Sequence, residues 1–305
     1  MLISGQMGYL NFYNIKEPPF ANIPDLRFFY NQFPFDESMK RVLAGIEDGK
    51  RVMTIIGGCG FGKTIISRKV LSMYEEDDDR YEIGLLVCLH SDMGAGWLMN
   101  KLAIQLHISV KEGESAFEKV AEKYLQICEK GVHGIIIIDE ASMIENQAVF
   151  DEIRGLIDFM ADNKLKFTVL FFGLPALEGK LAFNEPLLHR VESRTVLKTL
   201  PTTTEIRKYI THRLSVAGCE KSIFTDEAIH KMNETAKGNP RVINIICDNA
   251  LTEGYLNKQE IITEKEIERV IIEMGYNTRL KSLFLDVAKA TALPGQNPPP
   301  ANPQS

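Results

Sequence analysis

The stretch RVMTIIGGCGFGKT, residues 51–64, decides how this chain folds. Its first six residues are mostly apolar or β-branched and predict a buried strand. Four glycines then occur within eight residues, and they would weaken any helix or strand that they interrupted. A folded chain keeps such a segment where its backbone must approach another group closely. Residues 57–64 therefore predict a binding loop between a strand and a helix.

The same loop has the spacing G-x-x-x-x-G-K-T. Its glycines allow consecutive N–H groups to converge on phosphate oxygens, and the start of the next helix adds a favourable dipole. We expect the Lys63 ammonium to reach the β- and γ-phosphates of ATP and the Thr64 hydroxyl to ligate Mg²⁺. The residues predicted to bind the nucleotide here are Gly57, Gly58, Cys59, Gly60, Phe61, Gly62, Lys63, Thr64 and Ile65.

A second motif, IIIIDE at residues 135–140, is an apolar strand that ends in two carboxylates. Taken alone, it is explained equally well by acids at the surface end of a strand. Together with the phosphate loop it predicts a metal ligand in Asp139 and a residue that orients or deprotonates the attacking water in Glu140. An acid beside the metal ligand favours hydrolysis of the nucleotide over phosphoryl transfer to a small metabolite.

Composition restricts the class of protein. The chain has 305 residues, 45% hydrophobic and 25% charged, which is typical of a soluble globular protein. A net charge of −6 argues against general electrostatic binding of nucleic acid. Five scattered cysteines suit reduced thiols. There is no apolar run of about 20 residues and no basic segment before an apolar stretch at the N-terminus, so we expect a cytoplasmic protein without a transmembrane segment.

Apolar strand candidates alternate with amphipathic segments, which predicts an α/β fold. We expect a five-stranded parallel sheet sandwiched by helices, followed by a small all-helical lid. The predicted strands are 51–56, 82–89, 134–139, 167–172 and 194–199. The expected parts are an extended N-terminal segment packed on the core (1–35), a nucleotide-binding α/β domain (36–200), a helical lid (201–290) and a disordered proline-rich tail (291–305).

Three arginines are candidates for contact with the γ-phosphate. Arg241 ends the motif GNPR at the start of a predicted helix and is placed to swing over the nucleotide. Arg190 and Arg194 precede the predicted fifth strand and are candidates for an arginine finger in a neighbouring subunit's site. Each of these two is equally well explained as a solvated charge or a salt-bridge partner.

Several segments in order resemble the ExeA/GspA-type AAA ATPases of bacterial secretion and pilus assembly, from about residue 9 to about 275. They are YLNFYNIKEPPFANIPDLRFFY, GGCGFGKT, IIIIDEA, FFGLPAL and GNPRVINIICDNAL. The resemblance implies an AAA-type P-loop ATPase core with a helical lid, Arg241 as a nucleotide-sensing residue, and rings or filaments with sites between subunits. Related ATPases of the TniB and MuB type act on DNA in transposition.

The chain departs from this family in three ways. Ile65 replaces a second threonine after GKT, and Leu174 stands in FFGLPAL where a polar residue is common. Secretion members often continue into a transmembrane helix and a peptidoglycan-binding domain, which this sequence does not contain.

We therefore expect a Mg²⁺-dependent ATPase that forms a homo-oligomer and drives or regulates a secretion or pilus machine. One alternative is an ATP-dependent regulator of transposition that binds duplex DNA, because residues 179–214 contain seven Lys or Arg and three Asp or Glu. Another is a slow nucleotide switch, because Leu174 cannot hydrogen-bond a water or a γ-phosphate.

Overall fold

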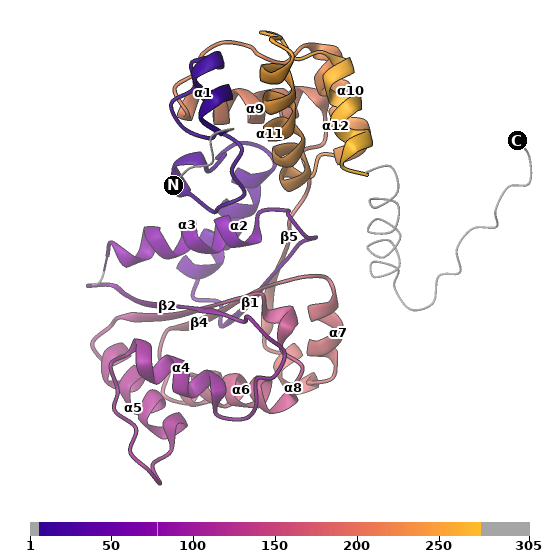
Figure 1. The fold of residues 1–305 in the computed structure, drawn as a ribbon. Coiled ribbons are helices and arrows are strands. Elements are labelled where there is room, and N and C mark those ends of the chain that lie inside the picture. Colours follow the sequence, from indigo (N-terminus) through magenta and orange to yellow (C-terminus); the bar gives the residue numbers. More distant parts are fainter. Residues whose placement is uncertain (1–5, 78, 276–305) are drawn as a thin grey trace, which may run out of the picture.

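The computed structural model describes residues 6–77 and 79–275. Its centre is a five-stranded sheet in the order β2-β3-β4-β1-β5 (Figure 1). All four strand pairings are parallel, as the alternation of strands and helices predicts. The strands are β1 (Val52–Ile56), β2 (Tyr81–Val87), β3 (His133–Asp139), β4 (Phe167–Gly173) and β5 (Val191–Val196).

Helices cover both faces of the sheet (Figure 1). Successive strand residues point to opposite faces, so Met53 and Ile55 pack under α2 and α3 while Val52 and Ile56 face α4, α5 and α6. The bounds are α2 (Phe35–Glu47), α3 (Lys63–Glu75), α4 (Trp97–Gln105), α5 (Ala116–Cys128), η2 (Ala141–Met143), α6 (Gln147–Asp162), α7 (Ala176–Ala182) and α8 (Glu185–Leu188).

The fifth strand lies three residues earlier than the predicted range 194–199. Its position is set by pairing with β1, which aligns Ile56 with Val196. The next residue, Leu197, donates its N–H to Ile56 O at 2.8 Å and buries its side chain in the core under α2 and α3. The prediction was wrong because the run RTVLKT shows strand propensity but not the register against β1. Arg194, the first residue of the predicted range, consequently lies inside the observed strand.

After Pro201 the described elements are helices, α9 (Thr203–Val216), α10 (Asp226–Ala236), α11 (Pro240–Leu256) and α12 (Glu264–Glu273). Thr263 and Glu266 form a capping box in both directions. Thr202 caps α9 through the Glu205 N–H, but the Glu205 carboxylate binds Lys208 and does not complete the box. One apolar face of α11 is fully buried, at Ile243, Ile246, Cys247 and Ala250.

The N-terminal segment packs on these four helices. It contains α1 (Gln6–Tyr13) and η1 (Leu26–Phe28), and its buried aromatic side chains belong to the lid core. Tyr9 Oη donates to Asp248 Oδ1 at 2.9 Å, and Tyr13 Oη donates to Gln259 O at 2.7 Å. We predicted packing on the α/β domain. The segment contacts α9 and α11 of the lid, and through η1 it also contacts α3 of the α/β domain.

Within the described residues, no helix has both the length and the apolar character required to cross a membrane. Residues 276–290 of the predicted lid and the predicted tail at 291–305 lie outside the described part of the chain.

Candidate functional site

The glycine-rich loop opens into a cavity of about 340 Å³ between the carboxyl edge of the sheet and the lid. One side of this cleft is formed by the loop and the first turn of α3, including Gly60, Lys63 and Thr64. The opposite side is formed by α9 and α11, and a third wall by residues 21–30. The cleft therefore brings together three parts of the chain that are far apart in the sequence.

Lys63 lies inside the glycine-rich loop. Its side chain is buried, and its ammonium donates to Gly57 O and Gly58 O, each at 3.1 Å. Burial lowers the pKa of Lys63, while the nearby Glu140 carboxylate opposes that shift. The ammonium is thus held inside the loop by two of its backbone carbonyls.

Asp139 ends β3 and is fully buried. Its Oδ1 accepts from the Glu140 N–H at 3.0 Å, and its Oδ2 lies 3.2 Å from Ser67 Oγ. Ser67 Oγ also lies 3.0 Å from Thr64 O, so it joins the Asp139 carboxylate to the first turn of α3. The sequence analysis missed Ser67. Ser67 could have been predicted from its spacing, because position 67 lies one turn after Thr64 on the same face of the helix.

The residues present fit a magnesium ion. Thr64 and Asp139 supply hard oxygen ligands, which Mg²⁺ prefers. Across residues 6–77 and 79–275 there is no cluster of three or more His, Cys, Asp or Glu side chains suited to a metal. An ion here would be completed by water and phosphate oxygens, which is how Mg²⁺ is usually held with a nucleotide.

Glu140 has a left-handed backbone, with φ of 53°, and its side chain lines the cleft. Such a conformation costs a non-glycine residue about 1–2 kcal/mol, and strained backbone of this kind clusters at functional sites. Leu174, which follows β4, lines the same cleft. Its N–H donates to Ser142 Oγ at 3.1 Å, so this position offers the cleft an apolar side chain beside Glu140.

The start of α11 touches the glycine-rich loop. Asn239 Nδ2 donates to Cys59 O at 3.0 Å, while Asn239 Oδ1 accepts from the Arg241 N–H at 3.0 Å and caps the helix. The Arg241 guanidinium lies 3.4 Å from Cys59 Sγ. Gly60 has φ of +79°, and a Cβ there would lie 2.5 Å from Arg241 Cβ. Arg241 is therefore placed beside the loop, and Asn239 is a site residue that the sequence analysis missed.

Arg190 and Arg194 lie outside the cleft. Arg190 Nε and Nη2 donate to the two carboxylate oxygens of Asp158 at 2.5 and 2.8 Å. Arg194, on the edge strand β5, pairs with Glu178 and keeps half of its side chain exposed. Both are bound to acids of their own chain, and their role in a neighbouring subunit stays a prediction.

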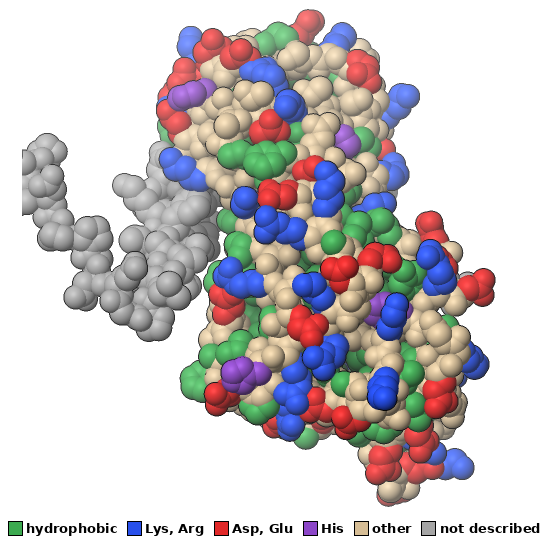
Figure 2. Space-filling view, turned by 180° about the vertical axis from the view of Figure 1, so that it is seen from behind, with side chains coloured by type: hydrophobic (Ala, Val, Ile, Leu, Met, Phe, Trp, Pro, Cys, Tyr) green, Lys and Arg blue, Asp and Glu red, His purple; other side chains and the backbone are tan. Residues whose placement is uncertain are grey.

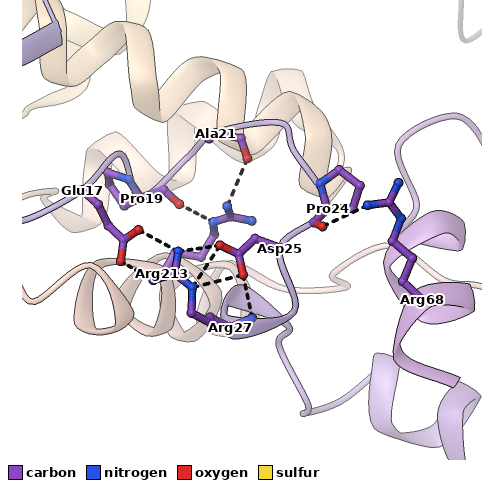
Figure 3. Close-up of polar contacts among 8 residues, drawn as sticks. All are labelled: Glu17, Pro19, Ala21, Pro24, Asp25, Arg27, Arg68 and Arg213. Atoms are coloured by element: carbon purple, nitrogen blue, oxygen red, sulfur yellow. Dashed lines mark hydrogen bonds and ion pairs between the residues drawn. The ribbon is translucent and has the colours of Figure 1, made fainter. Parts of the chain in front are cut away.

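We call residues 19–30 the strap; from Ala21 onward it forms the third wall of the cleft (Figure 3). Arg213 of α9 donates from Nε to Pro19 O at 2.5 Å and from Nη2 to Ala21 O at 3.2 Å. From the other domain, Arg68 of α3 donates to Pro24 O at 3.5 Å. The strap is thus held by arginines from both domains, and nothing in the sequence analysis anticipated that it would line the site.

Comparisons with known proteins agree with this architecture. Residues 46–181 match a family described as "AAA domain". The chain is 25% identical over 273 residues to General secretion pathway protein A of Aeromonas hydrophila. The match covers 88% of this chain and 48% of that protein, so the chain spans about half the length of this relative. The resemblance to the ExeA/GspA type is thereby confirmed.

Solved structures share the fold at low sequence identity. Cdc6p from Pyrobaculum aerophilum superimposes with a TM-score of 0.62 at 13% identity, covering 84% of this chain and 70% of that one. The Aeropyrum pernix ORC2 protein, solved as ADPNP-ADP complexes, gives 0.59 at 12% identity over 81% and 70%. The RuvB branch migration motor of Thermotoga maritima gives 0.52 at 17% identity over 78% and 67%. These matches confirm the predicted AAA-type P-loop fold.

Proposed function

We propose that this chain, whose residues 46–181 match the AAA domain family, is an ATPase that binds ATP with Mg²⁺ and hydrolyses it. The observation that carries the proposal is that one cleft is lined at the same time by Lys63, Thr64, Glu140 and Arg241. These are a phosphate-binding lysine, a metal-binding hydroxyl, an acid at the strand edge and an arginine from the lid, which together make up a phosphoryl-transfer site.

Each residue has a separate role in the proposal. Lys63 and the loop N–H groups bind the β- and γ-phosphates. Thr64 and Asp139 hold the metal, which when bound neutralises charge that develops on the phosphates. Glu140 orients or deprotonates the attacking water. Arg241 approaches the γ-phosphate from the lid, so the presence of that phosphate would change how the lid sits against the loop.

The wider role that we propose is the control or driving of a larger assembly of the secretion or pilus type, by a homo-oligomer. It is supported by the similarity to General secretion pathway protein A. In such an oligomer, Arg190 or Arg194 of one subunit would act on the nucleotide of the next, and the exposed Arg194 is the better placed of the two.

The proposal is tested by ATP binding to a Lys63→Ala variant, measured calorimetrically with Mg²⁺ present. We expect ATP affinity to fall at least about 100-fold, because the variant removes the buried charge that faces the phosphates. Lys69→Ala, on the same helix and outside the cleft, is the matched control and should bind ATP as the wild type does. Equal affinity of wild type and Lys63→Ala would refute the site.

One observation favours a second function, a nucleotide switch that turns over slowly. Leu174 occupies the cleft beside Glu140 and offers no polar group to a water or a phosphate. Steady-state phosphate release, compared between the wild type and Glu140→Gln, separates the two functions. A motor would lose most of its turnover in the variant, whereas a switch would show little turnover in either protein.

The alternative of DNA binding receives no support from the basic segment 179–214. One of its seven basic residues, Arg213, is buried. The other six pair with carboxylates of the same chain, Lys180 with Glu145, Arg190 with Asp158, Arg194 with Glu178, Lys198 with Glu37, Arg207 with Asp226 and Lys208 with Glu205. On the face drawn in Figure 2, basic and acidic side chains are interspersed and form no basic patch.

A further inference from the structure

A chain of three buried polar side chains runs through the lid into the cleft. Arg213 Nη1 lies 3.1 Å from Tyr209 Oη, and Tyr209 Oη lies 2.9 Å from Asn244 Oδ1. All three side chains line the cleft, and each keeps less than a tenth of its surface exposed. Burying polar groups is costly unless they are hydrogen-bonded. The hydrogen bonds among Arg213, Tyr209 and Asn244 offset this cost and fix the three side chains in the wall of the cleft.

The direction of these hydrogen bonds follows from the donors. A guanidinium only donates, so Tyr209 Oη accepts from Arg213. The single proton of the Tyr209 hydroxyl is then free to be donated to Asn244 Oδ1. That bond fixes the orientation of the Asn244 amide, with its oxygen toward Tyr209 and its Nδ2 at the other end. Among the described residues nothing accepts a hydrogen bond from Asn244 Nδ2, and this nitrogen is not among the buried unpaired polar atoms, so the donor is open to the cleft that Asn244 lines.

The same guanidinium also shapes the opposite wall. Besides Tyr209, Arg213 binds two carbonyls of the strap and lies 4.9 Å from the centre of the Phe28 ring (Figure 3 shows the carbonyl contacts). Ile23 of the strap lines the cleft with 73% of its surface exposed. The buried Arg213 guanidinium therefore holds the strap, which forms the apolar wall, and through Tyr209 also orients the Asn244 amide.

The position of the Asn244 amide indicates which part of a bound nucleotide lies next to it. Arg241 and Pro240, in the first turn of α11, lie next to the phosphate loop, and Asn244 lies one turn further along the same face of the helix. Around it the cleft is lined by flat or apolar side chains, among them Phe28, Ile23 and Pro240. Apolar walls with one placed polar group are typical of a site for an aromatic ring.

We propose that Asn244 reads the base of the bound nucleotide by donating from Nδ2 to a ring nitrogen of adenine, and that Tyr209 and Arg213 are positioning residues that orient it. This inference rests on the proposed function, because it assigns the part of ATP that lies beyond the phosphates. Adenine carries three such acceptors, N1, N3 and N7, and one of them is paired with Asn244.

The test is a cycle between the Asn244→Ala variant and ATP analogues in which one ring nitrogen is replaced by carbon: 1-deaza-, 3-deaza- and 7-deaza-ATP. We expect one analogue to bind the wild type about tenfold more weakly than ATP, the usual size of a buried hydrogen bond with an unpaired partner. Asn244→Ala should bind ATP about tenfold more weakly than the wild type. Asn244→Ala should bind that one analogue as well as it binds ATP, because the variant has already lost the donor that pairs with the replaced nitrogen.

Two further variants and one further ligand serve as controls. Asn249→Ala, on the same helix with its amide bound to Ile245 O at the surface, should bind every ligand as the wild type does. Asn244→Asp keeps an acceptor for Tyr209 but loses the donor, and should show the same loss for ATP. Tripolyphosphate, which lacks the base, should bind all variants equally and so shows that the phosphate loop is intact.

The inference would be overturned if Asn244→Ala lowered the affinity for ATP and for all three deaza analogues by the same factor. It would also be overturned if the variant lowered the affinity for ATP but not for 2′-deoxy-ATP, because Asn244 would then contact the ribose. A parallel loss of tripolyphosphate binding would also overturn it, because Asn244 would then act through the fold. In these cases Lys63-dependent ATP binding by the wild type would leave the proposed function standing. Failure of the wild type to bind ATP and tripolyphosphate would refute both.

Discussion

A single glycine lets the lid touch the phosphate loop. Gly60 combines φ of +79° with space for no side chain, since a Cβ would meet Arg241 Cβ at 2.5 Å and Asn239 Oδ1 at 2.8 Å. We expect Gly60→Ala to lower ATP affinity at least about tenfold, because displacing catalytic groups by about 1 Å is sufficient for losses of that order. Affinity would be measured by calorimetry.

Gly49 provides the matched control for Gly60. It has a similar φ of +71°, but nothing lies within 4 Å of a Cβ built there. Gly49→Ala should lower the free energy of unfolding by about 1–2 kcal/mol, the cost of a left-handed backbone for alanine, and leave ATP affinity unchanged. If the two variants bound ATP equally well, close contact between the lid and the loop would not matter for binding.

A buried histidine makes stability depend on pH. His133 Nε2 lies 2.9 Å from Thr168 Oγ1, which itself donates to Lys50 O at 2.7 Å, so the histidine donates from Nε2. Burial, helped by the Lys166 charge, lowers the pKa of His133 to about 4. The unfolded chain takes up a proton near pH 6.5 that the folded chain refuses until about pH 4. Stability is therefore full above pH 6.5 and falls between these values, by about 3 kcal/mol.

The prediction is checked by urea unfolding of the wild type and His133→Gln at pH 7.5 and pH 5. Glutamine keeps a donor near Thr168 but does not titrate, so the variant should lose less stability on acidification than the wild type. His107→Gln, at an exposed position, is the control and should follow the wild type. An identical pH dependence in wild type and His133→Gln would show that another group is responsible.

At the scale of elements, helix α11 joins the lid to the loop through its cap. The Cys59 carbonyl, which accepts from Asn239 Nδ2, shares a rigid peptide plane with the Gly60 N–H. Losing this bond would let that N–H turn away from the phosphates. We expect Asn239→Ser and Asn239→Ala both to bind ATP several-fold more weakly, as loss of one hydrogen bond implies.

The two variants at position 239 differ in stability. Serine still caps the helix, whereas alanine removes a cap worth about 1 kcal/mol. Asn239→Ala should therefore melt about 2–4 °C lower than Asn239→Ser, measured by circular dichroism. The proposed link between lid and loop would be contradicted if both variants bound ATP with wild-type affinity.

The sequence predicts elements better than it predicts their contacts. The strand at 51–56 and the helix after Lys63 follow from local composition, and the structure confirms both. The position of β5 depends on register against β1, and the packing of residues 6–35 depends on contacts with helices far along the chain, so neither is visible in local patterns. Asn244 did leave a signal in the sequence, because it is a polar residue between Ile243 and Ile245.

At the scale of the whole molecule, the proposed oligomer can be tested by mixing variants. Lys63→Ala lacks a working phosphate loop but keeps Arg194, and Arg194→Ala lacks the arginine but keeps its loop. If Arg194 acts on a neighbouring subunit's nucleotide, each variant alone is inactive, and mixing restores part of the phosphate release at mixed interfaces. Turnover of the mixture would be measured against each variant at the same total concentration.

Arg190→Ala serves as the comparison for Arg194→Ala. Its two hydrogen bonds to Asp158 tie the turn before β5 to α6, so its loss should lower thermal stability more than the loss of the exposed Arg194. A mixture of Lys63→Ala and Arg194→Ala with no more activity than its components would exclude Arg194 as a finger in trans.

The bond between Tyr9 and Asp248 joins positions 239 residues apart, and this has a consequence for synthesis on the ribosome. Tyr9 leaves the ribosome long before its native partner in α11 has been made. The central α/β domain can fold before α11 is made, since its core contains none of the aromatic residues of α1. The aromatic side chains of α1 therefore stay exposed until α11 has been made, which makes this segment one on which chaperones would act.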